Sequence, residues 1–405
     1  MTLVMDSGRA ASDAARAMNS GEREATNEGA DARDSDWRSG LKGLRVAFAG
    51  GGTGGHIAPG RHLLEHVGAE LEEVLWFCTG RPVEERAFDG LARARRVALD
   101  LEPASGGAPS LARLALRTAP SVLRARRELL RARSEVLLGL GGFTTLPAVL
   151  AARLLGIPVA LLEINAAPGR ATRRLAPLAA RTFHAWRSTL PSGEPSARDL
   201  WTGPPLPPRL IGVERTPASL ARARAALGFA PELPLLVVLG GSQGAGALNE
   251  FVASQAPLLL RGAQVLHQTG PGRSAEAAST RVGYRAVEFL TDVPAVLAAA
   301  TAVLCRGGAS TLAEVAAARC PAWVVPYPHH ADRHQERNAR ALGQGVVILD
   351  QARLDAHCAH ELLQQLTAAS PRALEERSAA LARALPLDAA ARIWRELGRL
   401  RARAS

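Results

Sequence analysis

The chain has 405 residues, 47% of them hydrophobic, and a formal net charge of +11, so it is long enough for two domains with separate cores. No apolar run approaches the ~18 residues of a spanning helix, and the N-terminus lacks the apolar segment of a signal peptide. The cysteines lack metal-ligand spacing, which favours a reducing, cytoplasmic setting. The arginine-rich charge permits anionic lipid or phosphate-bearing partners, but no nucleic-acid recognition module is found.

The most informative stretch is Gly50–Gly60, which follows the apolar, strand-like run Leu44–Ala49 and precedes a helical pattern over Ile57–His66. A strand that opens through glycines into a helix is typical of phosphate binding, because backbone N–H groups and the helix N-terminus attract an anion. Glycine-rich turns can also merely close a strand against a helix. His56 favours the functional interpretation, since it adds a titratable side chain at this point.

A second loop of the same kind follows the apolar run Pro234–Leu239. Gly240–Ala245 contains glycines and Ser242 and leads into a helix through Asn249 and Phe251. Two similar α/β halves that face one another would form a cleft with a phosphate-binding loop on each wall.

Strand and helix patterns alternate along both halves, which predicts parallel sheets with helices on both faces. The expected strands after Leu44–Ala49 are Val74–Cys78, Glu135–Leu140, Val159–Glu163, Leu235–Leu239, Ala263–Gln268, Arg285–Phe289, Ala302–Cys305, Ala322–Pro326 and Val346–Leu349. Ligands of such sheets bind at the carboxyl ends of the strands. In the first half, the loops predicted to border the site are Gly50–His56, Gly80–Glu85, Gly141–Thr145 and Glu163–Arg170.

We predict five segments from these patterns. They are a disordered tail over 1–42, an N-terminal domain on the acceptor and membrane side over 43–203, a proline-rich hinge and linker over 204–232, a C-terminal nucleotide-sugar domain over 233–385, and a helix over 386–405 that packs back on the first domain.

Leu111–Arg133 carries seven arginines among leucines and alanines. Such a helix can lie against anionic lipid headgroups. An amphipathic surface helix with a solvated arginine face explains the same pattern, and the sequence alone slightly favours this simpler explanation.

Two stretches of the second half also carry binding chemistry. Arg306–Glu314 follows a strand and opens a helix, so its glycines and hydroxyls suit a pyrophosphate, with Glu314 one turn further on for ribose hydroxyls or for the helix dipole. Pro326–Asn338 is dense in polar groups, and its three histidines lack a carboxylate pattern that would make them metal ligands. Hydrogen bonding to a sugar by Asp332, Gln335 and Asn338 is more plausible.

Several of these motifs occur in one register: Gly51–His56 with Pro59 and Gly60, Gly240–Ala245, His267–Gly270, Arg306–Ala309, and Pro326–His329 with His334, Gln335, Asn338 and Ala339. Together they resemble the MurG family, the peripheral membrane N-acetylglucosaminyltransferases of peptidoglycan synthesis, from about Leu44 to the C-terminus. The resemblance implies a GT-B fold of two Rossmann-like domains. It also implies inverting transfer of GlcNAc from UDP-GlcNAc to the MurNAc 4-hydroxyl of lipid I, at the cytoplasmic face of the membrane and without a metal or another cofactor.

The resemblance also assigns roles to individual residues. His56 would be the general base or a substrate ligand, and Thr53, Gly54 and Gly55 would line the diphosphate and acceptor side. Asn165 and Gln335 would bind the donor sugar, Ser242 the diphosphate, and Leu290 uracil through its backbone. The phosphates and ribose would fall to Ala309, Ser310, Thr311, Leu312, Ala313 and Glu314.

Two departures from the family pattern bear on substrate binding. Ile164 replaces a polar residue of the Glu-Gln-Asn motif, and Pro207 stands where an arginine is expected, with Arg209 as a candidate replacement. A related transferase with another lipid or natural-product acceptor, and a non-catalytic protein that binds UDP-sugar, remain alternatives. A nicotinamide-dependent dehydrogenase is disfavoured, because no acidic residue ends the strand at Cys78.

Overall fold

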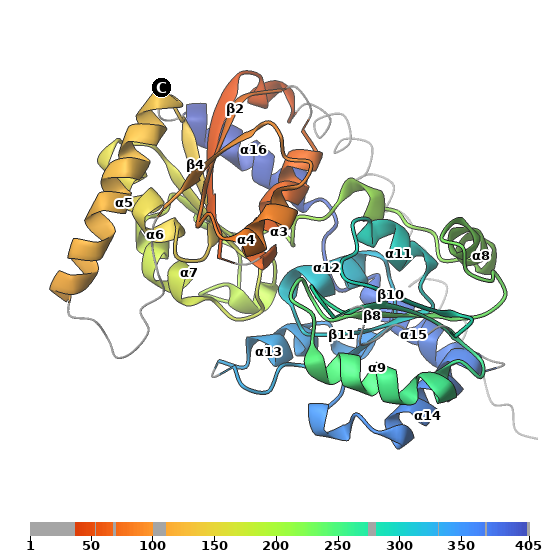
Figure 1. Ribbon diagram of the computed structural model, residues 1–405. Helices are drawn as coiled ribbons and strands as arrows, with labels where there is room; N and C mark the ends of the chain where they lie inside the picture. Colours follow the sequence, from red (N-terminus) through yellow and green to blue (C-terminus); the bar gives the residue numbers. More distant parts are fainter. Residues whose placement is uncertain are drawn as a thin grey trace, which may run out of the picture.

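The computed structural model describes residues 37–52, 54–67, 70–99, 111–273, 281–330, 332–368 and 371–402, and only the backbone of 111–117. Residues 1–36 of the predicted tail and Thr53 of the predicted site therefore lie outside the described residues. The described chain forms two α/β domains, each built on one parallel sheet (Figure 1).

The first domain contains a seven-stranded parallel sheet in the order β3-β2-β1-β4-β5-β6-β7. Its strands are β1 (Leu44–Gly50), β2 (Leu71–Cys78), β3 (Ala94–Ala98), β4 (Val136–Gly141), β5 (Val159–Glu163), β6 (Arg181–His184) and β7 (Asp199–Trp201). Its helices are α3 (Gly54–Glu65), α4 (Pro82–Glu85), α5 (Leu111–Arg131), α6 (Thr145–Leu154) and α7 (Arg170–Leu175).

The second domain contains a six-stranded parallel sheet in the order β10-β9-β8-β11-β12-β13. Its strands are β8 (Leu235–Leu239), β9 (Gln264–Gln268), β10 (Tyr284–Val287), β11 (Ala302–Cys305), β12 (Ala322–Val324) and β13 (Val346–Ile348). The helices that follow the first domain are α8 (Pro217–Ala226), α9 (Gly246–Leu259), α11 (Val293–Ala299), α12 (Ala309–Ala317), α13 (His334–Ala341), α14 (Ala356–Thr367), α15 (Arg372–Leu381) and α16 (Ala389–Ala402).

Short 3₁₀ turns complete the described chain: η1 (Ser39–Leu41), η2 (Arg86–Phe88), η3 (Ala176–Leu178), η4 (Arg187–Thr189), η5 (Pro208–Leu210), η6 (Gly343–Gly345) and η7 (Gln351–Arg353).

Buried apolar strands form the centre of each domain, as parallel sheets covered on both faces require. In β1 every residue except Arg45 is buried. On one face Phe48 stacks on Trp76 with ring centroids 4.9 Å apart, and Trp394 of α16 meets Phe48 edge-on. The opposite face of the sheet packs on α5 and α6 through Ala125, Leu129 and Val149, among others.

The predicted fold class, two Rossmann-like parallel-sheet domains, is confirmed, and the structure contains every strand expected from an apolar run, with ends shifted by a few residues. The sequence analysis missed β3, β6, β7 and α8. β3 and β7 are edge strands and β6 is next to the edge. Their sequences are short and partly polar, with two exposed arginines in β3, and therefore lack the continuous apolar pattern of a central strand.

The last helix returns to the first domain. Ile393, Trp394 and Leu397 of α16 join the first core, and Trp394 Nε1 donates to the carbonyl of Leu63 in α3 at 2.9 Å. In the segment predicted as a linker, α8 packs on α11, and Leu206 and Leu210 join the core of the second domain. This segment is therefore attached to the second domain along much of its length.

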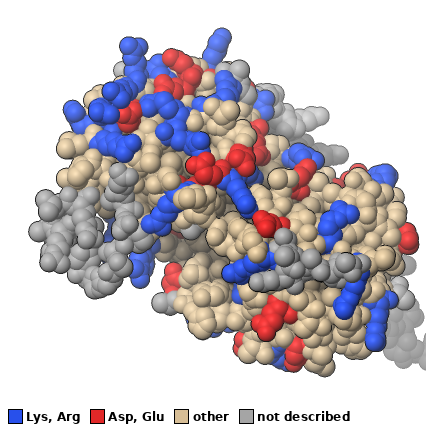
Figure 2. Space-filling view, viewed as in Figure 1, with Lys and Arg blue, Asp and Glu red and all other residues tan. Residues whose placement is uncertain are grey.

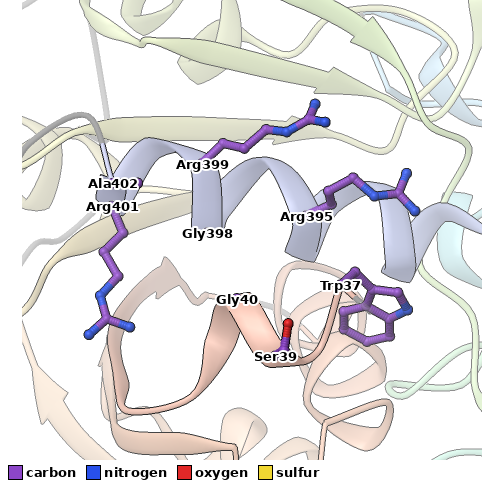
Figure 3. A pocket seen from close by; sticks show the side chains of 8 residues that line it. All are labelled: Trp37, Ser39, Gly40, Arg395, Gly398, Arg399, Arg401 and Ala402. Carbon is purple, nitrogen blue, oxygen red and sulfur yellow. The ribbon is translucent and has the colours of Figure 1, made fainter. Parts of the chain in front are cut away.

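A pocket of about 510 Å³ lies between η1 and α16 (Figure 3). Its walls are Trp37, Ser39, Gly40, Arg395, Gly398, Arg399, Arg401 and Ala402. Arg399 pairs with Glu396, and Arg401 binds Glu135 and the carbonyl of Lys42. None of the predicted site residues lines this pocket, so it is separate from the site described next.

Candidate active site

The two glycine loops face one another at the carboxyl ends of β1 and β8. A Cβ atom added to Gly54 would lie 3.6 Å from Ser242 Oγ, an ordinary van der Waals contact. The first turn of α3 in one domain therefore contacts the loop before α9 in the other. The structure brings together two segments that the sequence analysis predicted to form opposite walls of one site.

His56 lies in the first turn of α3, where its imidazole contacts the loop after β4. Its Nδ1 is 3.1 Å from the carbonyl oxygen of Gly51. Gly141 and Gly142 have positive φ angles, and a Cβ on either would approach the His56 ring to 3.1–3.2 Å. Glycine at these positions therefore provides the space that the ring occupies.

Burial lowers the pKa of His56 below its usual value, while the Gly51 carbonyl and the charges of Glu163 and Glu84 oppose the shift. At neutral pH the imidazole is therefore neutral. A carbonyl oxygen can only accept, so Nδ1 carries the proton and Nε2 carries the lone pair. This is the form that a general base requires.

Glu84 is a site-bordering residue that the sequence analysis did not select. Its side chain is only 2% exposed, and its carboxylate accepts from the backbone N–H groups of Gly52, Thr79 and Gly80. The loop Gly80–Glu85 was predicted to border the site, but no pattern distinguished Glu84 from its exposed neighbour Glu85. A glutamate four residues beyond a strand-ending glycine is the only local signal.

A second buried carboxylate organises the loop after β5. Glu163 accepts from the backbone and side-chain amides of Asn165 at 3.0 and 3.2 Å, and from Gly169 N and Thr172 Oγ1. Ile164 packs into the first core, which explains how an apolar residue fits between these polar neighbours.

Asn338 of α13 joins this loop to the second domain. Its Oδ1 accepts from Ala166 N at 2.7 Å, and its Nδ2 donates to Gly307 O at 3.0 Å and to Asn165 Oδ1 at 3.3 Å. Asn338 is fully buried. The structure thus places Asn165 beside the polar loop of the second domain, as a shared site requires.

Gln335 lies at the start of the same helix. Its Oε1 accepts from Tyr327 N at 2.9 Å and Gly307 N at 3.3 Å. These bonds orient the Gln335 side chain toward the loop that precedes α12.

The first turn of α12 contains the predicted phosphate and ribose residues. Ala309 packs against the first core, Leu312 and Ala313 are buried, and the Leu312 N–H already donates to Gly308 O at 2.9 Å, so the free backbone donors of this turn are those that precede Leu312. Ser310 Oγ is buried and has no hydrogen-bond partner within the described part of the chain. An unused hydroxyl at a helix N-terminus is suited to an anionic ligand.

Glu314 contacts the first domain directly. Its Oε1 lies 3.4 Å from Nε2 of His62 in α3, and both side chains are buried. Burial raises the pKa of Glu314 to about 7 and lowers that of His62 to about 3. His62 Nδ1 donates to Pro205 O at 3.1 Å, so its Nε2 carries the lone pair, and this buried atom has no hydrogen-bond partner among the described residues. The Glu314–His62 contact is therefore a close approach of two buried groups that burial keeps neutral.

The remaining predicted residues lie at the edge of the same region. Leu290 is half-buried after β10 and packs against the second core. Arg209, the candidate replacement for the missing arginine, forms an ion pair of 2.7 Å with Asp292, two residues from Leu290. Within the described residues, no group of three or more His, Cys, Asp or Glu side chains could hold a metal ion.

Two parallel-sheet domains with facing glycine loops form the GT-B architecture, and the family models below identify the class as glycosyltransferase. The glycosyltransferase family 28 N-terminal domain model matches residues 46–184, and the family 28 C-terminal domain model matches residues 235–393. The solved structure of Acinetobacter baumannii MurG, 22% identical, has the same fold, with a TM-score of 0.65 over 88% of this chain and 99% of that one.

Curated relatives identify the family more closely. A protein of Sorangium cellulosum is 39% identical over 87% of this chain and 88% of its own length, and one of Frankia casuarinae is 37% identical over 77% and 84%. Both carry the name UDP-N-acetylglucosamine–N-acetylmuramyl-(pentapeptide) pyrophosphoryl-undecaprenol N-acetylglucosamine transferase. The chain belongs to this family of N-acetylglucosamine transferases, and the resemblance to MurG is confirmed.

Proposed function

We propose that this enzyme transfers GlcNAc from UDP-GlcNAc to the MurNAc 4-hydroxyl of lipid I, which gives lipid II and UDP. The observation that carries the proposal is the position of His56, a neutral imidazole in the first turn of α3, where Gly54 lies beside Ser242 of the other glycine loop. A base and an anion-binding loop on opposite sides of one site suit the displacement of a nucleoside diphosphate by a hydroxyl group.

In this mechanism His56 Nε2 accepts the proton of the acceptor hydroxyl as its oxygen forms a bond to C1 of GlcNAc. The bond between C1 and the diphosphate oxygen breaks, and UDP leaves with the electron pair. Attack from the opposite side inverts the configuration at C1. Backbone N–H groups of Gly240–Ala245 and of the first turn of α12, with Ser242 and Ser310, would hold the developing charge on the diphosphate.

The sugar and nucleoside would be bound at the edges of this site. Gln335 and Asn165 would bind the hydroxyls of GlcNAc, Glu314 the ribose, and the backbone at Leu290 the uracil. Gly54 and Gly55 would approach the diphosphate and the acceptor, together with Thr53. Because Glu314 contacts His62 in the observed conformation, ribose binding requires this contact to open.

We further propose that the first domain binds the cytoplasmic face of the membrane as a peripheral protein. No helix among the described residues is long and apolar enough to span a bilayer. On α5, Leu123 and Leu130 are 66% and 51% exposed, and they lie among the exposed arginines Arg124, Arg126, Arg127 and Arg131. Figure 2 shows basic side chains gathered around the C-terminal half of α5. Exposed leucines between cations are suited to an anionic lipid surface.

The transfer is tested with purified protein, UDP-GlcNAc and a soluble-chain lipid I analogue, with the disaccharide product measured by mass spectrometry. We expect product from the wild-type protein and much less from His56→Ala and Glu314→Ala. Donor binding without product would contradict the acceptor assignment. The absence of both would favour a non-catalytic protein.

Membrane binding is tested by flotation with vesicles. Leu123→Ser/Leu130→Ser should reduce binding to phosphatidylglycerol vesicles, while Leu233→Ser, at an exposed leucine of the second domain, should not. Equal binding of all three proteins would exclude α5 as the membrane contact.

A further inference from the structure

One peptide group connects a buried carboxylate to the predicted base. The N–H of Gly52 donates to Glu84 Oε1, and the carbonyl of Gly51, on the other side of the same peptide bond, accepts from His56 Nδ1 at 3.1 Å. The N–H and the C=O of a trans peptide point in opposite directions. The carboxylate, the Gly51–Gly52 peptide and the imidazole therefore form one continuous hydrogen-bonded chain.

The carboxylate of Glu84 is held firmly in this arrangement. Its Oε2 accepts from Gly80 N at 2.8 Å and from Thr79 N at 3.0 Å, which fixes it to the carboxyl end of β2. A Cβ on Gly51 would lie 2.5 Å from Glu84 Oε1, so the carboxylate occupies the space that any other side chain at this position would need. Both oxygens face N–H donors, so the group acts as an acceptor, as an ionised carboxylate does.

We propose that Glu84 is a positioning residue for transfer, which fixes the proton of His56 on Nδ1 and stabilises the imidazolium through the Gly51–Gly52 peptide. The proposal rests on the proposed role of His56 as general base. When Nε2 takes the proton of the acceptor hydroxyl, the ring becomes positive while Nδ1–H continues to donate to Gly51. A carboxylate at the N–H end of the peptide polarises its carbonyl and strengthens that bond.

The arrangement corresponds to the carboxylate that orients a histidine in many enzymes, with a peptide group inserted between them. The titratable groups that act on the His56 ring are Glu84 on α4, Glu163 at the end of β5 and His334 on α13. The two carboxylates raise its pKa and His334 lowers it. Of these three groups, Glu84 is the one whose described hydrogen bonds lead to the ring through a shared peptide.

The pH dependence of the transfer rate distinguishes the proposed positioning role of Glu84 from a purely structural role. If Glu84 only anchored the glycine loop, its removal would lower stability and activity at every pH by the same factor. If it stabilises the imidazolium, its removal lowers the pKa of His56 and moves the acid limb of the rate profile to lower pH.

The test compares Glu84→Gln with Glu85→Gln, a neighbour on α4 whose exposed side chain pairs with Arg96. The kcat/KM of GlcNAc transfer is measured against pH, and the pKa and tautomer of His56 are measured by NMR with ¹⁵N-labelled histidine. We expect Glu84→Gln to reduce kcat about tenfold to a hundredfold, to leave the donor KM within about twofold, and to move the acid limb to lower pH. Glu85→Gln should match the wild type.

An unchanged His56 pKa in folded Glu84→Gln would overturn the proposal. If Glu84→Gln does not fold, the wild-type spectrum still decides, because a His56 proton on Nε2 instead of Nδ1 excludes the connection. The NMR arm also separates this proposal from the proposed function. A shifted His56 pKa in a protein that transfers no GlcNAc would support the connection while contradicting the transferase assignment.

Discussion

The two glycine loops have similar sequences but different surroundings. In the first domain, the loop after β1 donates the Gly52 N–H to the buried carboxylate of Glu84 and presents the Gly51 carbonyl to His56. In the second domain, the loop after β8 packs on Thr269 and Gly270, and no described acidic side chain accepts from its backbone. The first loop therefore holds a base, whereas the second keeps donors available for an anionic ligand.

The difference comes from the neighbouring strand. The β2–α4 connection delivers a glutamate to the first loop, and the β9 connection delivers only backbone and Gln268, whose Nε2 donates to Gly241 O at 3.2 Å. A strand–glycine–helix pattern therefore predicts the backbone shape of the loop. The side chain that the neighbouring strand places beside the loop decides what the loop binds.

Removal of the base should give the largest effect. His56→Ala should lower kcat by about 10²–10⁴-fold, because no group then accepts the hydroxyl proton, and should leave UDP-GlcNAc affinity nearly unchanged. Ser242→Ala should instead weaken donor binding in isothermal titration calorimetry. If both variants weaken donor binding equally, the first loop does not serve only to hold the base and the second does not alone bind the donor.

The buried carboxyl of Glu314 should give a pH-dependent effect on the free energy of unfolding of about 3 kcal/mol. The pKa of Glu314 is raised in the folded protein to about 7 from the model value of 4.5, so its contribution is complete below pH 4.5 and is lost as pH rises through 7. The pKa of His62 is lowered to about 3, so its contribution is lost as pH falls below 6.5.

Glu314→Gln separates these two contributions, because a glutamine amide stays uncharged at every pH, as the carboxyl does only while it is protonated. The free energy of unfolding of this variant should match that of the wild type below pH 4.5, exceed it increasingly as pH rises to about 7, and exceed it by a constant amount at higher pH. A constant difference at all pH values would contradict the neutral pair.

The close packing of Gly51 against Glu84 can be tested by substituting alanine for glycine. Gly51→Ala should lower the free energy of unfolding by about 1–3 kcal/mol, since its Cβ would lie 2.5 Å from Glu84 Oε1 and 3.1 Å from Cys78 Cα. Gly54→Ala, whose nearest contact would be Ser242 Oγ at 3.6 Å, is the matched control and should be nearly neutral. Equal thermal midpoints for the two variants would show that the first loop has room to adjust.

The smallest effect on stability is expected for a change at Arg209 in the linker. The ion pair of Arg209 with Asp292 is largely exposed, so Arg209→Ala should change stability by no more than about 1 kcal/mol. If Arg209 replaces the missing arginine, the same variant raises the donor KM. An unchanged KM would exclude that replacement.

The central strands and both glycine loops could be predicted because each leaves a local pattern. β1, β4 and β8 are continuous apolar runs, which burial on both faces of a parallel sheet requires. The position of His56 within a strand–glycine–helix unit could also be predicted from the local sequence pattern alone. An edge strand such as β3 leaves no such pattern, because two of its consecutive residues are exposed arginines.

The sequence by itself determined the fold class, the strands that are continuous apolar runs, and the loops that carry most of the predicted site residues. Only the tertiary structure decided which side chains meet. Glu84 reaches Gly52, Asn338 reaches Asn165, and Glu314 reaches His62 across distances in sequence that no periodicity encodes. Local patterns record burial and backbone conformation, whereas the environment of a buried carboxylate depends on which strands lie side by side.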